Sequence, residues 1–322
     1  MFSYDARGIK INSLDFWLDA HRKVLFSFVS HGHADHLKNH DTILATPATI
    51  QFHAHRARQK KAIPLNLGEK YELDYIIIEL FPAGHEMGSA MSRVEIDGMS
   101  LLYSGDFKMK KSWTADDIKI PNADILIMES TFGDPQYIYD HSQDYLRDEV
   151  FNFVEDCFRS GTTPLVMGYA LGKAQEAMKM LGDAGYKVRV HRAAWELAKI
   201  YMQFGITFEN CTPWKDESIA ADEVLLIPPH SLKFNRVRNL PARYRTVFLS
   251  GWANSPNGMR FGAHHTIPMS DHADFNELLE FVRQVNPHKI YTTHGFDHFP
   301  QYLRDIGYDA ELLTETTQTS LF

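Results

Sequence analysis

The first part of the chain carries short apolar runs that are bounded by glycine, proline or polar residues. Such runs are typical of β-strands. Asp97-Gly98 stands between two of them and predicts a tight hairpin. One helix is expected in this region, at residues 47–60. The expected strands are 76–81, 93–96, 100–103 and 125–128.

From about residue 140 to about residue 240 the pattern changes to alternating helices and strands. In residues 144–158, apolar side chains recur at helical spacing and predict an amphipathic helix. This order predicts a small parallel α/β unit inserted into the chain. Its further expected elements are strand 164–167, helix 172–183, strand 188–190, helix 192–204 and strand 224–227.

The last part returns to strands and polar turns. Residues 247–250 are expected to form a strand, residues 269–275 to open a helix that runs to Val285, and residues 289–293 to form a strand. His294 follows the last strand at once. Earlier strands also end in polar side chains: His85, Asp106 and Glu129.

Composition restricts the class of protein. The 322 residues are 44% hydrophobic and 23% charged, which is ordinary for a folded domain. No apolar stretch reaches the roughly 18 residues that span a bilayer, and residues 1–10 lack a signal-peptide core, so we expect a cytoplasmic protein with no membrane partner. Cys157 and Cys211 are too few for a disulfide framework. The net charge of −8 argues against non-specific coating of nucleic acid, but not against an enzyme that acts on it.

Residues 30–36 are the most informative segment. They place three histidines and an aspartate directly after the apolar run 24–29, whereas most of the 17 histidines need no special role. In extended backbone, His31 and His33 point to the same side, and Asp35 and His36 can point to a second position. Imidazole and carboxylate suit zinc, with manganese or iron as alternatives.

Four separated pieces together resemble the metallo-β-lactamase fold: residues 31–36, 84–90, 104–107 and 293–295. The resemblance implies an α/β fold, an αββα sandwich with a two-metal site on strand-end loops. Residues 129–133 and 270–275 resemble the additional motifs of the β-CASP nucleases, which cut RNA or DNA. The inserted α/β unit lies where that branch carries its cap domain.

Within that branch, residues 248–253 and the following Ser270-Asp271-His272 are similar to proteins called DNA ligase-associated exonucleases, also labelled mRNA 3′-end processing factor-like. The implied domains are a metallo-β-lactamase domain in two parts, residues 1–140 and 244–322, and a β-CASP-like cap at residues 141–243.

The resemblance implies a site for two divalent ions, zinc or alternatively manganese. One ion would take His31, His33 and His85, and the other would take Asp35, His36 and His294. Asp106 would bridge them. Asp19 would support the histidine loop through hydrogen bonds; the alternative is an ordinary surface-loop aspartate.

The family pattern implies His272 as general acid, with Glu129 orienting its imidazole. The alternative for Glu129 is a helix cap or surface carboxylate. Asp35 also belongs to the implied catalytic set. Asp271 and Asp274, near His272, are expected simply to cap the following helix.

Substrate contacts are expected from Ser89, Lys108 and Arg236. Ser89 lies in a glycine-flanked turn where backbone amides could approach a phosphate, although a simple tight turn explains it equally well. Lys108 and Arg236 belong to two of three basic clusters, and such clusters are usually solvated faces. These clusters comprise basic residues within 53–61, within 108–111 and within 233–245.

These features predict a metal-dependent phosphodiesterase: a DNA exonuclease acting on single strands or ends in DNA repair, functionally associated with DNA ligase and helicase. The alternatives are an RNA exo- or endonuclease of the 3′-end processing type, a thioester or lactam hydrolase, and a non-catalytic member of a processing complex. The filled ligand positions argue against the last.

Overall fold

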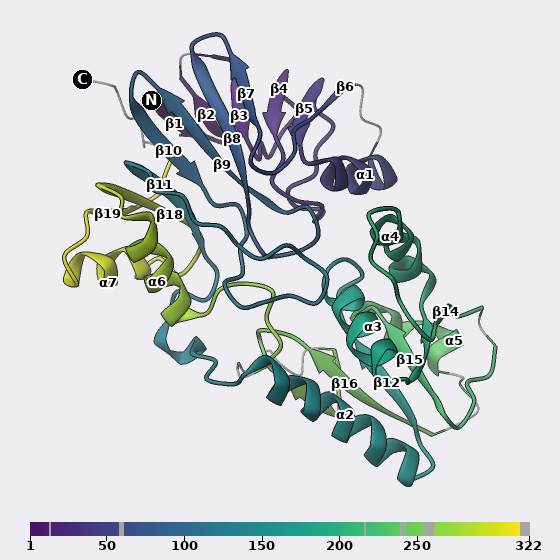
Figure 1. Ribbon diagram of the computed structural model, residues 1–322. Helices are drawn as coiled ribbons and strands as arrows, with labels where there is room; N and C mark the ends of the chain where they lie inside the picture. The colour runs from purple at the N-terminus through teal and green to yellow at the C-terminus, as the bar shows by residue number, and fades with distance from the viewer. Residues whose placement is uncertain are drawn as a thin grey trace. The chain divides into compact units, whose positions relative to one another are not determined.

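The computed structural model describes residues 1–12, 14–57, 61–215, 217–238, 240, 243–253, 255 and 261–315. The chain divides into two compact units (Figure 1). Unit 1 comprises Met1–Lys111, Ala115–Ile138 and His272–Phe322, and unit 2 comprises Ser112–Thr114 and Tyr139–Asp271. No described helix has the length and apolar character needed to cross a membrane.

Unit 1 contains two mixed sheets. The first has the order β1-β2-β3-β4-β5-β6 and the second β19-β18-β11-β10-β9-β8-β7. The first sheet's strands are β1 (Phe2–Asp5), β2 (Gly8–Ile11), β3 (Phe16–Leu18), β4 (Phe26–Phe28), β5 (Thr42–Ala45) and β6 (Lys61–Pro64). The second sheet's strands are β7 (Lys70–Leu73), β8 (Ile76–Pro82), β9 (Ala90–Ile96), β10 (Met99–Tyr103), β11 (Ile125–Ser130), β18 (Lys289–Gly295) and β19 (Ala310–Leu312). The helices of unit 1 are α1 (Pro47–Arg56), η1 (Pro135–Tyr137), α6 (Phe275–Val285) and α7 (Phe299–Asp305).

The layers of unit 1 follow from the two-residue period of its strands. Leu101 packs into the core between the two sheets, whereas Leu102 packs on the opposite face, in the core shared with α6. On the outer face of the first sheet, Ile43 packs with Ile50 of α1. The expected αββα sandwich is therefore confirmed, with α1 on one side and α6 and α7 on the other (Figure 1).

Unit 2 is built on one sheet in which all strand pairs are parallel, in the order β14-β13-β15-β12-β16-β17. This confirms the expected small parallel α/β unit. Its strands are β12 (Thr163–Met167), β13 (Lys187–Val190), β14 (Cys211–Pro213), β15 (Glu223–Ile227), β16 (Tyr244–Leu249) and β17 (His265–Ile267). Its helices are α2 (Gln143–Arg159), α3 (Lys173–Asp183), α4 (Arg192–Gln203), η2 (Pro229–Lys233) and α5 (Asn235–Arg238).

Several boundaries differ from the sequence expectations. The helix expected at 47–60 ends at Arg56, and residues 58–60 lie outside the described part. The helix expected to open within 269–275 begins only at Phe275, because Asp274 caps it and closes a capping box with Glu277. Unit 2 extends to Asp271 rather than to residue 243, since β16 pairs with β12. The assignment of catalytic and cap domains to these units stays a prediction.

Candidate metal centre

Strand direction brings the polar strand ends of unit 1 together. β9 is antiparallel to both β8 and β10, so β8 and β10 run the same way. β10 is parallel to β11, and β11 is parallel to β18. The carboxyl ends of these four strands therefore share one edge of the sheet. His85 and Asp106 follow β8 and β10, and Glu129 and His294 are the penultimate residues of β11 and β18.

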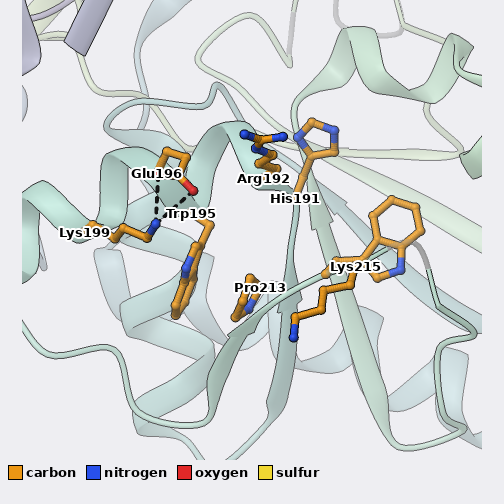
Figure 2. A pocket seen from close by; sticks show the side chains of 8 residues that line it. His191, Arg192, Trp195, Glu196, Lys199, Pro213 and Lys215 are labelled. Carbon is orange, nitrogen blue, oxygen red and sulfur yellow. Dashed lines mark hydrogen bonds and ion pairs between the residues drawn. The ribbon is translucent and has the colours of Figure 1, made fainter.

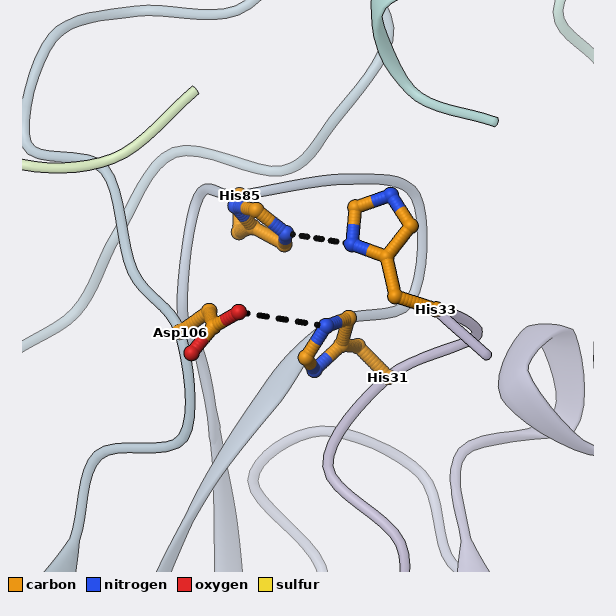
Figure 3. Close-up of side chains that lie close together, drawn as sticks. All are labelled: His31, His33, His85 and Asp106. Carbon is orange, nitrogen blue, oxygen red and sulfur yellow. Dashed lines mark hydrogen bonds and ion pairs between the residues drawn. The ribbon is translucent and has the colours of Figure 1, made fainter. Parts of the chain in front are cut away.

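The first group of potential ligands consists of His31, His33, His85 and Asp106, whose ligand atoms lie within 4.8 Å of one another (Figure 3). His85 Nε2 lies 3.0 Å from His33 Nδ1, and His31 Nε2 lies 3.5 Å from Asp106 Oδ2. Three imidazoles and one carboxylate in this compact arrangement form a donor set suited to zinc.

The His31 ring has a lone pair on Nε2 that can bind a cation. Its Nδ1 lies 2.9 Å from Ser30 Oγ, which itself donates to Asp19, so Nδ1 carries the proton and Nε2 the lone pair. Nε2 is buried and has no hydrogen-bond donor among the described residues. Burial, together with the neighbouring His36 and His85 imidazoles, holds the pKa of His31 well below its usual value. The residues therefore fit a metal ion on the evidence of their own chemistry.

A second group shares one member with the first. His36, Asp106 and His294 bring their ligand atoms within 4.8 Å of one another. His36 Nε2 lies 3.6 Å from Asp106 Oδ2. Burial raises the pKa of Asp106 in spite of the adjacent His36. Because Asp106 belongs to both groups, its position is compatible with the bridging role that the resemblance implies.

Asp19 is buried and does not lie on the surface, which excludes the alternative of an exposed loop residue. Its Oδ1 accepts from the Ser30 amide at 2.8 Å, and its Oδ2 accepts from Ser30 Oγ at 2.5 Å, His36 Nδ1 at 2.8 Å and Tyr103 Oη at 3.0 Å. Burial alone would lower the pKa of His36, but the carboxylates of Asp106 and Asp19 raise it to about 10. A cation bound at His36 would displace that proton.

Asp35 differs from the other predicted ligands. Its side chain is 79% exposed, and its Oδ2 lies 3.7 Å from His36 Nε2. It belongs to none of the ligand groups found among the described residues. The Asp35 carboxylate is largely exposed and lies at the edge of the cluster, beside the His36 ring atom that also faces Asp106. Its predicted metal and catalytic roles stay predictions.

His272 and Glu129 form a directed pair beside Asp106. Both Glu129 oxygens lie 2.9 Å from His272 Nδ1, and the three residues form a further compact group. Glu129 also accepts from the Phe107 amide at 2.9 Å and from the Thr131 hydroxyl. Glu129 is 1% exposed and caps no described helix, so the helix-cap and surface alternatives are excluded. Burial alone would raise the pKa of Glu129, but the His272 charge and hydrogen bond lower it.

Two of the predicted substrate contacts, Ser89 and Lys108, are buried. The Ser89 hydroxyl is buried and accepts from the backbone amides of His85 and Glu86 at 3.2 Å each, which closes a tight turn. Lys108 is also buried, at 5% exposure. The side chain of Arg236 lies outside the described part of the structure.

Of the two alternative helix caps, Asp274 caps α6, whereas Asp271 lies in unit 2 with its Oδ2 3.7 Å from Lys173 Nζ. Asp274 also accepts from Lys110 Nζ at 3.2 Å, so one lysine of the second basic cluster is used within unit 1.

Sequence reasoning missed two groups that hold the site. Glu86 is 2% exposed; its Oε1 accepts from the Gly32 amide at 2.6 Å and its Oε2 lies 3.6 Å from His33 Nε2. Tyr103 donates to Asp19 from the end of β10. The position of Glu86 next to His85 was a signal for the first, whereas the apolar run around Tyr103 gave none.

Comparison with known proteins shows three kinds of similarity. Residues 259–312 match the family described as "Zn-dependent metallo-hydrolase RNA specificity domain". The chain is 36% identical to a "Probable DNA ligase" of Opitutus terrae over 98% of its own length and 31% of that protein's. The crystal structure of a protein of unknown function from Enterococcus faecalis superposes with a TM-score of 0.64 at 15% identity, covering 91% of this chain and 80% of that one, and shows the fold.

Two further relatives carry names connected with nucleic acids. The "DNA cross-link repair protein SNM1" of Arabidopsis thaliana is 24% identical over 83% of the chain and 60% of its own length. "Endoribonuclease YSH1" of Candida glabrata is 24% identical over 67% of the chain and 35% of its own length. The chain thus spans between about a third and three fifths of the length of these three curated relatives.

Proposed function

Because the chain belongs to the metallo-β-lactamase β-CASP nuclease family of metal-dependent hydrolases, we propose that it is a two-metal-dependent nuclease that hydrolyses phosphodiester bonds in DNA. The proposal includes exonuclease action on single strands or ends in DNA repair. It also includes a cytoplasmic location and a functional association with DNA ligase and helicase.

The observation that carries this proposal is the shared position of Asp106. It belongs to both histidine groups and to the Asp106–Glu129–His272 group. Phosphodiester hydrolysis needs positive charge at the phosphate oxygens and a proton for the departing sugar oxygen. The ions held by the histidine groups would supply the positive charge on one side of the Asp106 carboxylate, and His272 would supply the proton on the other. This arrangement supports phosphodiester cleavage more than a site that only holds metal.

The first ion would be held by His31, His33 and His85, the second by Asp35, His36 and His294, with Asp106 common to both. Bound divalent ions would supply charge neutralisation for the phosphate and lower the pKa of the attacking water. Of these ligands, His31, His36, His85 and Asp106 are buried, and burial strengthens such electrostatic interactions, whereas His294 is exposed.

His272 is suited to the proton transfer. Glu129 accepts a hydrogen bond from Nδ1–H, which fixes the ring. Nε2 is then the atom that can hold and release a second proton. The carboxylate favours the protonated imidazole, since opposite charges at this distance stabilise each other. The side chain is 21% exposed, so a substrate oxygen can reach it. We assign His272 as general acid and Glu129 as its positioning residue.

The names of two relatives support DNA as the substrate, since one is a probable DNA ligase and another a DNA cross-link repair protein. A second candidate is RNA exo- or endonucleolytic processing. It is favoured by the family description at residues 259–312, which names RNA specificity, and by an endoribonuclease among the relatives.

One experiment tests the proposal. Purified protein loaded with zinc or manganese receives end-labelled single-stranded DNA and RNA of one sequence, and products are resolved with time. Cleavage of DNA in single-nucleotide steps is expected; preference for RNA would support the second candidate. Asp106→Ala should abolish cleavage and reduce bound metal. Cleavage of neither strand, with turnover of a thioester or lactam, would overturn the nuclease proposal.

A further inference from the structure

Unit 2 carries a concave site of its own. A cavity of about 380 Å³ opens between α4 and the residues at the end of β14. This volume falls within the range of small-molecule pockets. Figure 2 shows the lining side chains, with Trp195 and Lys215 on either side of Pro213. Its lining residues are His191, Arg192, Trp195, Glu196, Lys199, Pro213, Trp214 and Lys215.

The pocket lies where a parallel sheet commonly binds ligands. β13 and β14 are parallel neighbours, and their carboxyl ends lead directly to His191 and Trp214. In open α/β sheets the crevice beyond the carboxyl ends of the strands is the usual ligand position. The backbone of unit 2 therefore presents these side chains at a favourable edge.

The positive charges of the pocket are only partly compensated. Lys199 Nζ lies 2.9 and 2.8 Å from the two oxygens of Glu196, and this exposed pair is visible in Figure 2. Arg192 and Lys215 are exposed and have no ion pair or hydrogen bond with side chains in the described part of the chain. In a protein of net charge −8, this local excess of positive charge favours an anionic ligand.

The apolar wall indicates what else the ligand contains. Trp195 is partly exposed, and its ring has no aromatic or cationic contact among the described residues. A tryptophan face that is open beside a proline offers a platform for a flat ring. A base supplies the ring and its phosphate the negative charge, whereas inorganic phosphate alone would leave the indole unused.

We propose that this pocket binds one nucleotide of a single-stranded nucleic acid, with the base on Trp195 and a phosphate at Arg192 and Lys215. The inference rests on the proposed nuclease function and adds to it a strand-holding site on unit 2. Stacking on an aromatic side chain tolerates any base, so the site contributes affinity for the strand and no sequence preference.

The test measures binding and cleavage separately. Metal-loaded protein carrying His272→Ala, which slows cleavage, is titrated with a fluorescent oligothymidylate. Adding Trp195→Ala should weaken binding about tenfold, and Trp195→Phe should restore most of it. Arg192→Ala with Lys215→Ala should flatten the dependence of log Kd on log salt by about 0.7, the value for one phosphate contact in a single strand. Alanine is favoured in helices, so α4 should persist in these variants.

Matched controls lie in the same unit. Phe204, at the end of α4, is also exposed, and Phe204→Ala should leave binding unchanged. Arg159 and Lys187 are exposed and engaged in ion pairs, so Arg159→Ala with Lys187→Ala controls for the loss of two charges.

Two results would overturn the proposed site: unchanged oligothymidylate binding in Trp195→Ala, or thymidine monophosphate that binds as tightly as the oligonucleotide, which would indicate a site for free nucleotides. Absence of cleavage by the native protein, with Trp195-dependent binding retained, would reject the nuclease and leave the strand site standing.

Discussion

His272 Nδ1 lies 2.9 Å from both carboxylate oxygens of Glu129, although the two residues are 143 positions apart in the chain. The Glu129 carboxylate is buried, and it is further held by the Phe107 amide. A carboxylate fixed in this way determines the orientation and the tautomer of the imidazole, so the free ring atom is Nε2.

The pair predicts a separation of metal binding from catalysis. His272→Ala should lower kcat by about 10²–10⁴-fold, because general acid assistance is lost, while the bound metal content stays at the native level. Glu129→Gln should lower kcat less, since the amide can still accept one hydrogen bond. Steady-state cleavage and elemental analysis of the same samples give both quantities. Loss of metal from His272→Ala would place this histidine among the ligands instead.

Asp19 predicts a second, purely supporting effect. Asp19→Asn removes the charge that holds Ser30, His36 and Tyr103 but preserves the side-chain shape, and asparagine tolerates the positive φ of 43°. Metal affinity should fall about 10–100-fold in competition with a chelator. Asp97→Asn is the control, because Asp97 has a φ of 50° but lies in an exposed hairpin. Equal affinity in both variants would contradict the supporting role.

The contacts of Glu86 predict a supporting role in metal binding. Its carboxylate holds the Gly32 amide and lies 3.6 Å from His33 Nε2, so it orients the loop between two predicted ligands. Glu86→Gln should weaken metal binding about tenfold with little change in unfolding free energy. Glu79→Gln, on the strand that leads to the same loop, should have no effect on metal binding, since Glu79 pairs with Lys70 at 4.0 Å and belongs to no ligand group among the described residues. Wild-type metal affinity in Glu86→Gln would remove this assignment.

Gly88 predicts a packing requirement beneath the site. Its φ is +76°, and an added Cβ would lie 2.6 Å from Ala48 Cβ and 2.8 Å from Thr46 Oγ1, at the start of α1. Gly98→Ala is the matched control, because Gly98 has a φ of +78° with nothing within 4 Å of its Cβ position. Gly98→Ala should cost about 1–2 kcal/mol of unfolding free energy. Gly88→Ala should cost roughly 1–3 kcal/mol more, from overpacking. Equal urea midpoints in both variants would contradict this reading.

The sequence by itself determined the elements whose side chains alternate strongly. The alternating burial of β8 and the helical stripe of α2 report which faces are buried, since burial of one face of a strand or helix is a local property. Short strands such as β3 and β14 were not predicted, because their three residues are too few to show a repeating pattern.

The residue types of the site were also readable from the chain, whereas their partnership was decided only by the tertiary structure. Strand order and direction, which no local pattern encodes, bring Asp106 into contact with both histidine groups and with Glu129. The same tertiary arrangement leaves the Asp35 side chain largely exposed, with its carboxylate oxygen 3.7 Å from His36 Nε2. Sequence spacing shows which side chains are neighbours along the chain. Which strand ends come close in space depends on how segments far apart in the chain pair with one another.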